Sequence, residues 1–233
     1  MSNLKPDVFF DLSNYKHASI FDSQEYVWTA LSQISFYLNS LSLGKIEVDI
    51  PTGVYLVDSH LISIGKGTVV EPGAYIKGPC IIGENCTIRH GAYVRGHVIT
   101  GNKCVIGHDS ELKNVILLNE SHAPHFAYVG DSILGNRVNL GAGTVCANLK
   151  LDDQIVTIMQ DGKRISTGLR KFGAIIGDDS KLGCNSVTNP GTIIGRGVFC
   201  YPCVNMGGII PSHSRVRNNH NLIITPLGTD HDS

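Results

Sequence analysis

Residues 64–107 read IGKGTVVEPGAYIKGPCIIGENCTIRHGAYVRGHVITGNKCVIG and repeat one pattern every six residues. Aliphatic side chains recur at this spacing, and a small residue usually follows each one four places later. The repeat positions from 64 to 118 are Ile64, Val70, Ile76, Ile82, Ile88, Val94, Thr100, Ile106, Leu112 and Leu118. The pattern returns as Leu134, Leu140 and Cys146, and again as Ile176, Leu182, Thr188, Ile194, Cys200 and Met206.

The period of six excludes a helix and a flat strand as the source of the pattern. An α-helix turns every 3.6 residues, so a strict period of six rotates the apolar stripe away from any core. A flat strand alternates every two residues and ends after about five or six. A coil with three short strands per turn, each strand using one period, places every aliphatic residue inside a triangular prism whose rungs stack about 4.8 Å apart. The sequence therefore predicts an all-β fold, a parallel β-helix.

Composition narrows the classes of function. The chain has 233 residues and a formal net charge of -1, so no basic field predicts a nucleic-acid partner. The first residues lack a basic segment followed by an apolar stretch, and no window approaches the roughly 18 to 20 apolar residues of a membrane span. Seven cysteines without an export signal indicate free thiols in a reducing compartment. We expect a cytoplasmic protein without membrane contact.

The repeat explains most of the cysteines as core residues. Cys80, Cys86 and Cys104 fall on the small inward position, whereas Cys146 and Cys200 fall on the large inward position. The run CYPC at 200–203 resembles half of a zinc or redox site, but it lies in the repeat register and lacks a second pair of ligands. We interpret these cysteines as reduced core thiols.

The flanks differ from the repeat. Residues 23–43 show apolar residues at helical spacing, which predicts a helix capped by Asp22 or Ser23 and ended by Gly44. We expect it to pack on the first coils or on a neighbouring subunit. The predicted divisions are an N-terminal helical segment at 1–50, the β-helix at 51–215 and a C-terminal tail at 216–233. The predicted inward face of the helix comprises Val27, Leu31, Ile34, Leu38 and Leu41.

Two interruptions of the repeat mark the expected site. The spacing between Leu118 and Leu134 is not a multiple of six, so the sequence predicts an extruded loop at 119–133. A second insertion, at 147–173, contains VTIMQDGKRIS, which alternates around Asp161-Gly162 and predicts a hairpin. Insertions in repeat proteins gather on one face, often the binding face.

Several side chains near the predicted loop suit catalysis on a polar ligand. His125 has an ordinary pKa near neutrality and is a candidate proton acceptor. Tyr128 and Asn139 are candidates to orient a polar ligand. Lys113 and Arg95, which stands at the equivalent position one turn earlier, are candidates to hold a phosphate. His122 and His125 lack a third ligand, so we predict no metal site.

Longer motifs resemble a known family. HFAYVGDSILGNRVNLGAGTVCAN, at 125–148, resembles the acetyltransferase half of bacterial bifunctional N-acetylglucosamine-1-phosphate uridyltransferases. TGLRKFGAIIGDDSKLGCN, at 167–185, resembles the archaeal-type sugar-1-phosphate nucleotidyltransferases with an acetyltransferase tail. The resemblance covers about residues 62–205. It implies a left-handed β-helix, acetyl-CoA as co-substrate, and a homotrimer with each site between two prisms.

The resemblance also implies residue roles. Leu149 stands where the bacterial family has an aromatic residue, and Cys184 stands where it has a coenzyme-contacting serine. In this resemblance His125 matches the general base, and Arg95 and Lys113 match the phosphate-binding pair. Other groups around the amino sugar phosphate are matched by Tyr128, Asn139 and Lys171. The positions at the coenzyme end are those of Ala142, Asn148, Leu149 and Cys184.

Three functions remain open from the sequence. The first is acetyl-CoA-dependent N-acetylation of an amino sugar 1-phosphate. The second is acyl transfer to a nucleotide-linked amino sugar, and the third is a non-catalytic β-helix that serves as a scaffold or sugar-nucleotide binder. Residues 1–60 are too few for the family's nucleotidyltransferase domain, so we expect no uridyltransferase activity.

Overall fold

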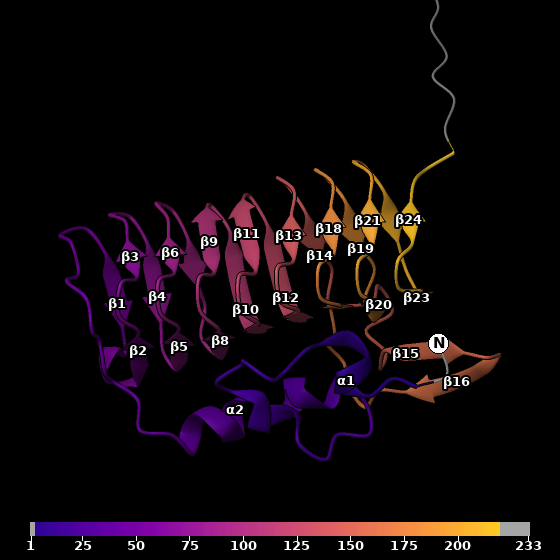
Figure 1. Ribbon diagram of the computed structural model, residues 1–233, viewed down its shortest axis with the longest axis horizontal. Helices are drawn as coiled ribbons and strands as arrows, with labels where there is room; N and C mark the ends of the chain where they lie inside the picture. The colour runs from indigo at the N-terminus through magenta and orange to yellow at the C-terminus, as the bar shows by residue number, and fades with distance from the viewer. Residues whose placement is uncertain (1–2, 220–233) are drawn as a thin grey trace, which may run out of the picture.

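The computed structural model describes residues 3–219 and contains a triangular prism of short parallel strands (Figure 1). We call its three sides face A, face B and face C, in chain order around each turn. Face A holds β1 (Tyr55–Val57), β4 (Tyr75–Lys77), β7 (Tyr93–Val94), the first halves of β10 (Glu111–Leu117) and β12 (Tyr128–Leu134), β14 (Val145–Cys146), β19 (Val187–Thr188) and β22 (Asn205–Met206).

The other two faces follow the same order along the axis. Face B holds β2 (Ile62–Ile64), β5 (Cys80–Ile82), β8 (Val98–Thr100), the second halves of β10 and β12, β17 (Ala174–Ile176), β20 (Thr192–Ile194) and β23 (Ile209–Ile210). Face C holds β3 (Val69–Val70), β6 (Thr87–Ile88), β9 (Val105–His108), β11 (His122–His125), β13 (Asn139–Leu140), β18 (Lys181–Leu182), β21 (Phe199–Cys200) and β24 (Arg215–Val216).

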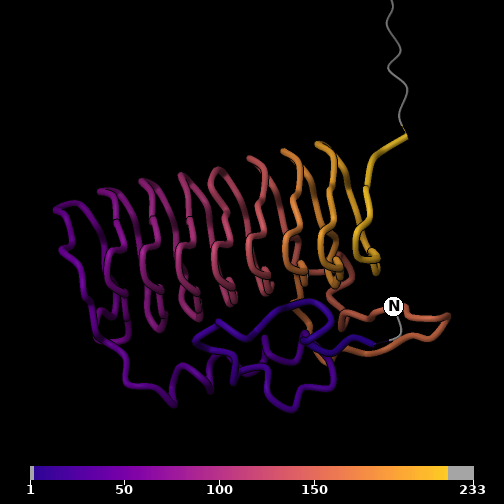
Figure 2. Tube along the Cα trace, viewed as in Figure 1, coloured from indigo at the N-terminus to yellow at the C-terminus, as the bar shows by residue number. Residues whose placement is uncertain are grey.

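The register confirms the predicted parallel β-helix. Ile76 pairs with Val94 on face A, and Val70 pairs with Ile88 on face C, so each aliphatic residue meets the third one after it in the repeat. These side chains are buried in one continuous core that runs the length of the prism. Backbone hydrogen bonds run along the axis between paired strands of successive turns. Figure 2 shows these turns stacked one after another.

The loop predicted at 119–133 is absent, and that prediction is wrong. β11 and β12 fill this segment in register with their neighbours, and Leu117 pairs directly with Leu134 on the next turn. Two turns are each shorter by a single residue because Asn114 (φ 55°) and Asp131 (φ 46°) make a tight left-handed corner between faces A and B. Leu118 consequently packs outside the prism, while Leu117 fills the inward position.

The second predicted insertion is present. Cys146 pairs with Thr188 on the next turn, so all the extra chain between them leaves the coil at the corner between faces A and B. It forms the antiparallel hairpin of β15 (Thr157–Gln160) and β16 (Lys163–Ser166), turned by Asp161 (φ 49°) and Gly162 (φ 75°). The positive φ at both turn residues is the geometry that an Asp-Gly hairpin favours.

The N-terminal segment is helical, as predicted, but its main helix is shorter. The segment contains α1 (Pro6–Phe9), the 3₁₀ turn η1 (Ala18–Phe21) and α2 (Thr29–Asn39); a further 3₁₀ turn, η2 (Ser59–Leu61), lies in the first coil. Ser23 has a φ of 58°, which is not helical, and α2 begins only at Thr29. Neither Asp22 nor Ser23 therefore caps α2. Leu41 is 37% exposed, whereas Val27, Leu31, Ile34 and Leu38 are buried as predicted.

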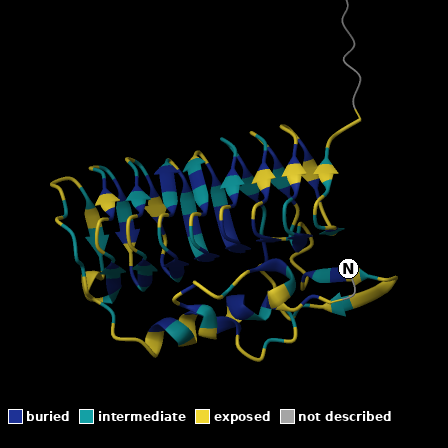
Figure 3. Ribbon diagram, viewed as in Figure 1, coloured by how far each residue is buried: buried dark blue, intermediate teal, exposed yellow. Residues whose placement is uncertain are grey.

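The N-terminal segment and the hairpin cover the outside of face B. α2 lies against β10 and β12, in the middle of the prism rather than on the first coils. In Figure 3 buried ribbon lines the lower edge of the prism, where it faces the helical segment. Removing this apolar surface from water stabilises the covering by about 25 cal/mol per Å². The covered outward column consists of Ile81, Ile99, Ile116, Ile133, Ile175, Ile193 and Ile209.

A polar column at the corner between faces B and C fixes the segment. Asn136 Oδ1 accepts from the backbone N–H of Asn119, one turn earlier, and Asp178 Oδ1 accepts from that of Asn136. The side-chain NH₂ groups of Asn119 and Asn136 donate to the backbone carbonyls of Asn14 and Asp11, respectively. The backbone N–H of Asp11 donates to Asp178 at 2.7 Å. The column therefore joins successive turns and holds the segment in place.

The cysteines lie where the repeat places them. Cys80, Cys86, Cys104, Cys146 and Cys200 are buried, and all seven thiols are free. Cys203 is exposed while Cys200 points into the core, so the CYPC run does not form a pair. Within residues 3–219, no cluster of three or more His, Cys, Asp or Glu residues is placed to hold a metal ion. No helix in the same range has the length and hydropathy of a membrane span. Most of the predicted tail, 220–233, lies outside the described residues.

Candidate active site

His125 lies at the corner between faces C and A, at the end of β11. Its side chain is exposed, and its backbone carbonyl accepts from Gly143 at 3.1 Å. The register of β11, β13 and β18 places Ala142 and then Cys184 at the same corner on the next two turns. The predicted base and two residues predicted for the coenzyme end therefore form one line parallel to the prism axis.

The same line continues toward the N-terminus with two histidines that the sequence analysis did not single out. His90 and His108 stack with their ring centroids 5.7 Å apart, and His108 lies 5.3 Å from the ring of Phe126. Nδ1 of His108 lies 2.9 Å from the carbonyl oxygen of His90. Because a carbonyl only accepts, this Nδ1 carries the proton in the neutral ring. The spacing of His90, His108 and His125, close to one turn each, was the available signal.

Arg95 and Lys113 lie at the other edge of face A, the corner with face B. They follow Val94 and Leu112, which are paired neighbours, so the two cations are one rung apart. The Arg95 guanidinium forms an ion pair with Glu111 and lies 5.7 Å from the centre of the Tyr93 ring. The structure thus brings together the two side chains that the sequence assigned to a phosphate.

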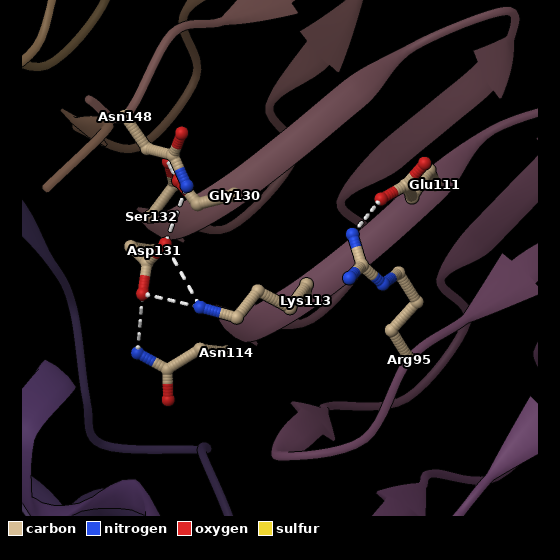
Figure 4. A network of polar contacts seen from close by, with 8 residues as sticks. All are labelled: Arg95, Glu111, Lys113, Asn114, Gly130, Asp131, Ser132 and Asn148. Atoms are coloured by element: carbon tan, nitrogen blue, oxygen red, sulfur yellow. Dashed lines mark hydrogen bonds and ion pairs between the residues drawn. The ribbon is translucent and has the colours of Figure 1, made fainter. Parts of the chain in front are cut away.

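Asp131 is the centre of the polar network at this corner, and the sequence analysis gave it no role. The residue is 4% exposed. Its carboxylate accepts from Lys113 Nζ at 3.2 and 3.3 Å, from Asn114 Nδ2 at 3.0 Å and from Asn148 Nδ2 at 2.5 Å (Figure 4). Its place in the motif HFAYVGD, at 125–131, was the available signal.

Tyr128 lies on face A between the two edges. Its pKa is raised by burial and, to a smaller degree, by the negative charges of Glu111 and Asp131. Its hydroxyl therefore remains a hydrogen-bond donor at neutral pH. A Cβ on Gly130 would lie 2.7 Å from this hydroxyl and 2.6 Å from Asn148 Nδ2, so the two side chains use the space that glycine leaves.

The remaining predicted residues lie apart from this group. Asn139 lies on β13 and is half-buried on face C, beside His122 and Lys181. Lys171 is exposed where the insertion returns to the coil, and its backbone pairs with that of Leu149, which is 39% exposed. The side chains predicted for one ligand therefore lie on two faces of a single prism.

Comparisons with known proteins agree with the fold. Residues 76–170 match the family described as the GMPPB C-terminal domain. A bifunctional sugar-1-phosphate nucleotidylyltransferase/acetyltransferase from Sulfurisphaera tokodaii is 45% identical over 40% of this chain and 23% of its own. The bifunctional protein GlmU from Methanococcus maripaludis strain S2 is 34% identical over 85% of this chain and 47% of its own.

A shorter relative covers a larger share of both chains. The uncharacterized acetyltransferase YaiX from Escherichia coli O6:K15:H31 is 34% identical over 65% of this chain and 66% of its own. By contrast, the alignments with the two bifunctional proteins span at most about half of those proteins. Over its coils the chain is therefore similar to the bifunctional sugar-1-phosphate nucleotidylyltransferase/acetyltransferases and to this shorter acetyltransferase.

Proposed function

We propose that the protein is an acetyl-CoA-dependent N-acetyltransferase that acts on an amino sugar 1-phosphate, such as glucosamine 1-phosphate, with His125 as general base. One observation carries the proposal. His125 is exposed at one edge of face A, while Arg95 and Lys113 lie at the opposite edge of the same face. An amino sugar phosphate carries both groups that this face would bind, an amine for the proton acceptor and a phosphate for the two cations.

The reaction needs a base because the acceptor amine is protonated at neutral pH. The amine loses its proton to His125, attacks the thioester carbon and releases the thiol of coenzyme A. A well-placed base typically contributes about 10²- to 10⁴-fold in rate. The imidazole of His125 makes no hydrogen bond within residues 3–219, so both ring nitrogens are open to a ligand.

The phosphate-binding role of Arg95 and Lys113 rests on their unused donors. Arg95 donates through Nη1 to Glu111, which leaves its other N–H groups for a phosphate. Lys113 is held by Asp131 but still 31% exposed, and an ammonium has three donors. Tyr128, with its raised pKa, supplies a neutral hydroxyl between the base and this pair.

Acetyl-CoA belongs at the C-terminal continuation of the His125 edge. Ala142 and Cys184 follow His125 on the next two turns, and Asn148 lies beside Tyr128. Leu149 supplies an apolar surface at the start of the insertion. Backbone N–H groups of this glycine-rich stretch are candidates to stabilise the oxyanion of the tetrahedral intermediate.

A complete site needs two copies of the chain. Asn139 points from face C, and face C lies opposite the corner that carries Lys113. One small ligand contacts both only when face C of a second copy meets face A of the first. A homotrimer with three such interfaces is a closed arrangement that meets this requirement.

A nucleotide-linked amino sugar is the second candidate acceptor. Lys77 follows Ile76 as Arg95 follows Val94, so the row of cations continues one rung beyond the pair that a single phosphate needs. A diphosphate reaches further along such a row than a monophosphate. This alternative keeps the same base and the same coenzyme.

The test is release of free thiol from acetyl-CoA with a panel of acceptors. Glucosamine 1-phosphate should be turned over faster than glucosamine without phosphate, because Arg95 and Lys113 hold the anion. Faster turnover of a uridine diphosphate-linked amino sugar than of the 1-phosphate selects the second candidate. No thiol release with any amino sugar contradicts both and leaves the non-catalytic scaffold.

A further inference from the structure

Asp131 binds donors from two separate segments of the chain. Lys113 and Asn114 come from β10, and Asn148 comes from the first residues of the insertion. Four donor contacts converge on the two oxygens of one carboxylate. Only an ionised carboxylate offers enough acceptor sites for this set without presenting a donor of its own.

The backbone around Asp131 also fixes the insertion where it returns to the coil. Gly173 N–H donates to the Asp131 carbonyl at 2.8 Å, and Ala174 N–H donates to the hydroxyl of Ser132 at 2.9 Å. Phe172 N–H donates to the Asn148 carbonyl at 2.9 Å. Both ends of the insertion are therefore bound to one short stretch of β12, with Lys171 directly beside them.

We propose that Asp131 is a positioning residue that holds the phosphate-binding lysine and the coenzyme-side asparagine in a fixed relation. This inference rests on the proposed function for the ligands of Lys113 and Asn148, and it adds the group that couples them. Asp131 is buried and touches neither reacting atom. Its effect passes through Lys113 and Asn148.

The physical gain is preorganisation. A free lysine side chain loses rotamer freedom when it binds a phosphate, and ordering a long side chain in advance removes that cost from binding. Asp131 holds Lys113 and Asn148 before a ligand arrives, at the corner where the short turns bring them together. The acceptor and the coenzyme then bind to Lys113 and Asn148, whose distance from each other is already fixed.

Asp131→Asn is the direct test. The amide keeps the size of the carboxylate but turns an NH₂ group toward Asn114 or Asn148, both donors, in either orientation. Asp179→Asn is a matched control, because Asp179 also has a positive φ (63°) and also pairs with a cation, Arg137. Asp131→Asn should weaken the binding of both coenzyme A and glucosamine 1-phosphate by about 10- to 100-fold, as loss of hydrogen bonds to a charged group does.

Asn114→Gly is the second variant, and it leaves the buried charge of Asp131 unchanged. Glycine accepts the positive φ of Asn114 and removes only the donor to Asp131. Asn114 has no assigned ligand, so a loss of affinity for both ligands must act through Asp131. In turnover assays both variants should raise KM for both substrates more than they lower kcat, unlike a change of the base.

A ligand-free measurement separates this proposal from the proposed function. Hydrogen exchange at the Phe172 amide should be faster in Asp131→Asn than in the parent and unchanged in Asp179→Asn, because Asn148 loses its anchor. Unchanged exchange overturns the network. Faster exchange in Asp131→Asn, combined with a parent protein that binds neither ligand, contradicts the assigned ligands. Unchanged affinity for either ligand in Asp131→Asn overturns the positioning role.

Discussion

Lys113 and Asn139 point in opposite directions from one prism: Lys113 lies at the corner between faces A and B, and Asn139 lies on face C, opposite that corner. We therefore predict that Lys113→Ala and Asn139→Ala are each nearly inactive but complement each other when refolded together. In a random mixture, roughly a quarter of the interfaces carry both native residues, so about a quarter of parent activity should return.

The control for this mixture is each variant refolded alone, with light scattering to report the trimer mass. Mixtures that stay as inactive as the separate variants contradict a site shared between copies. A monomer mass at micromolar concentration contradicts it independently.

Gly130→Ala should damage the site while leaving the fold intact. The atoms nearest to the added Cβ are the ends of two side chains, Tyr128 and Asn148, which move away at little cost in stability. Displacement of reacting groups by a fraction of an ångström lowers kcat/KM by about 10- to 100-fold. Gly207→Ala occupies the same repeat position three turns later, with its nearest neighbour, Asn189, at 3.2 Å, and should leave kcat/KM unchanged. Equal effects of the two substitutions would remove Gly130 from the account.

The buried His17 predicts acid sensitivity of the N-terminal segment. Burial lowers its pKa from 6.5 to about 4, and its Nδ1 lies 2.9 Å from the Tyr37 hydroxyl. The unfolded chain binds this proton more readily, so the contribution of neutral His17 is present above pH 6.5 and is lost as the pH falls toward 4. Between pH 7.5 and 5.0 the parent should lose about 2 kcal/mol more unfolding free energy than His17→Gln, measured by urea denaturation. The same loss in both proteins contradicts the assignment.

Thiol reactivity tests the register of the coils. Cys184 and Cys203 are exposed and should react quickly with Ellman's reagent in the native protein, while the other five react only after unfolding. Burial raises the pKa of Cys80 to about 12 and that of Cys146 to about 11. Interaction with the neighbouring Cys104 thiol lowers the pKa of Cys86, but burial of Cys86 still keeps the reagent away. More than two fast thiols would contradict the inward placement of the repeat cysteines.

The six-residue period predicts the prism because every turn repeats the same local constraint. It does not predict the short turns, because a missing residue and an inserted loop both leave an irregular gap between Leu118 and Leu134. To decide between them one must know that Asn114 and Asp131 adopt left-handed backbone conformations at their corners. These conformations depend on tertiary contacts.

Other outcomes follow the same division between local and distant causes. The hairpin at Asp161-Gly162 was predictable because its turn chemistry is local. The start of α2 was not predictable, because nothing in the local sequence indicates the positive φ of Ser23. The candidate base and phosphate pair came from a motif, whereas the role of Asp131 depends on contacts between β10, β12 and the insertion.

The most direct test of the central claim is kcat for acetyl transfer to glucosamine 1-phosphate by His125→Ala, compared with His60→Ala, an exposed histidine in the first coil. The account predicts a loss of about 10²- to 10⁴-fold in kcat for His125→Ala, no loss for His60→Ala and the same melting temperature in both variants. Parent-like turnover by His125→Ala would contradict the account.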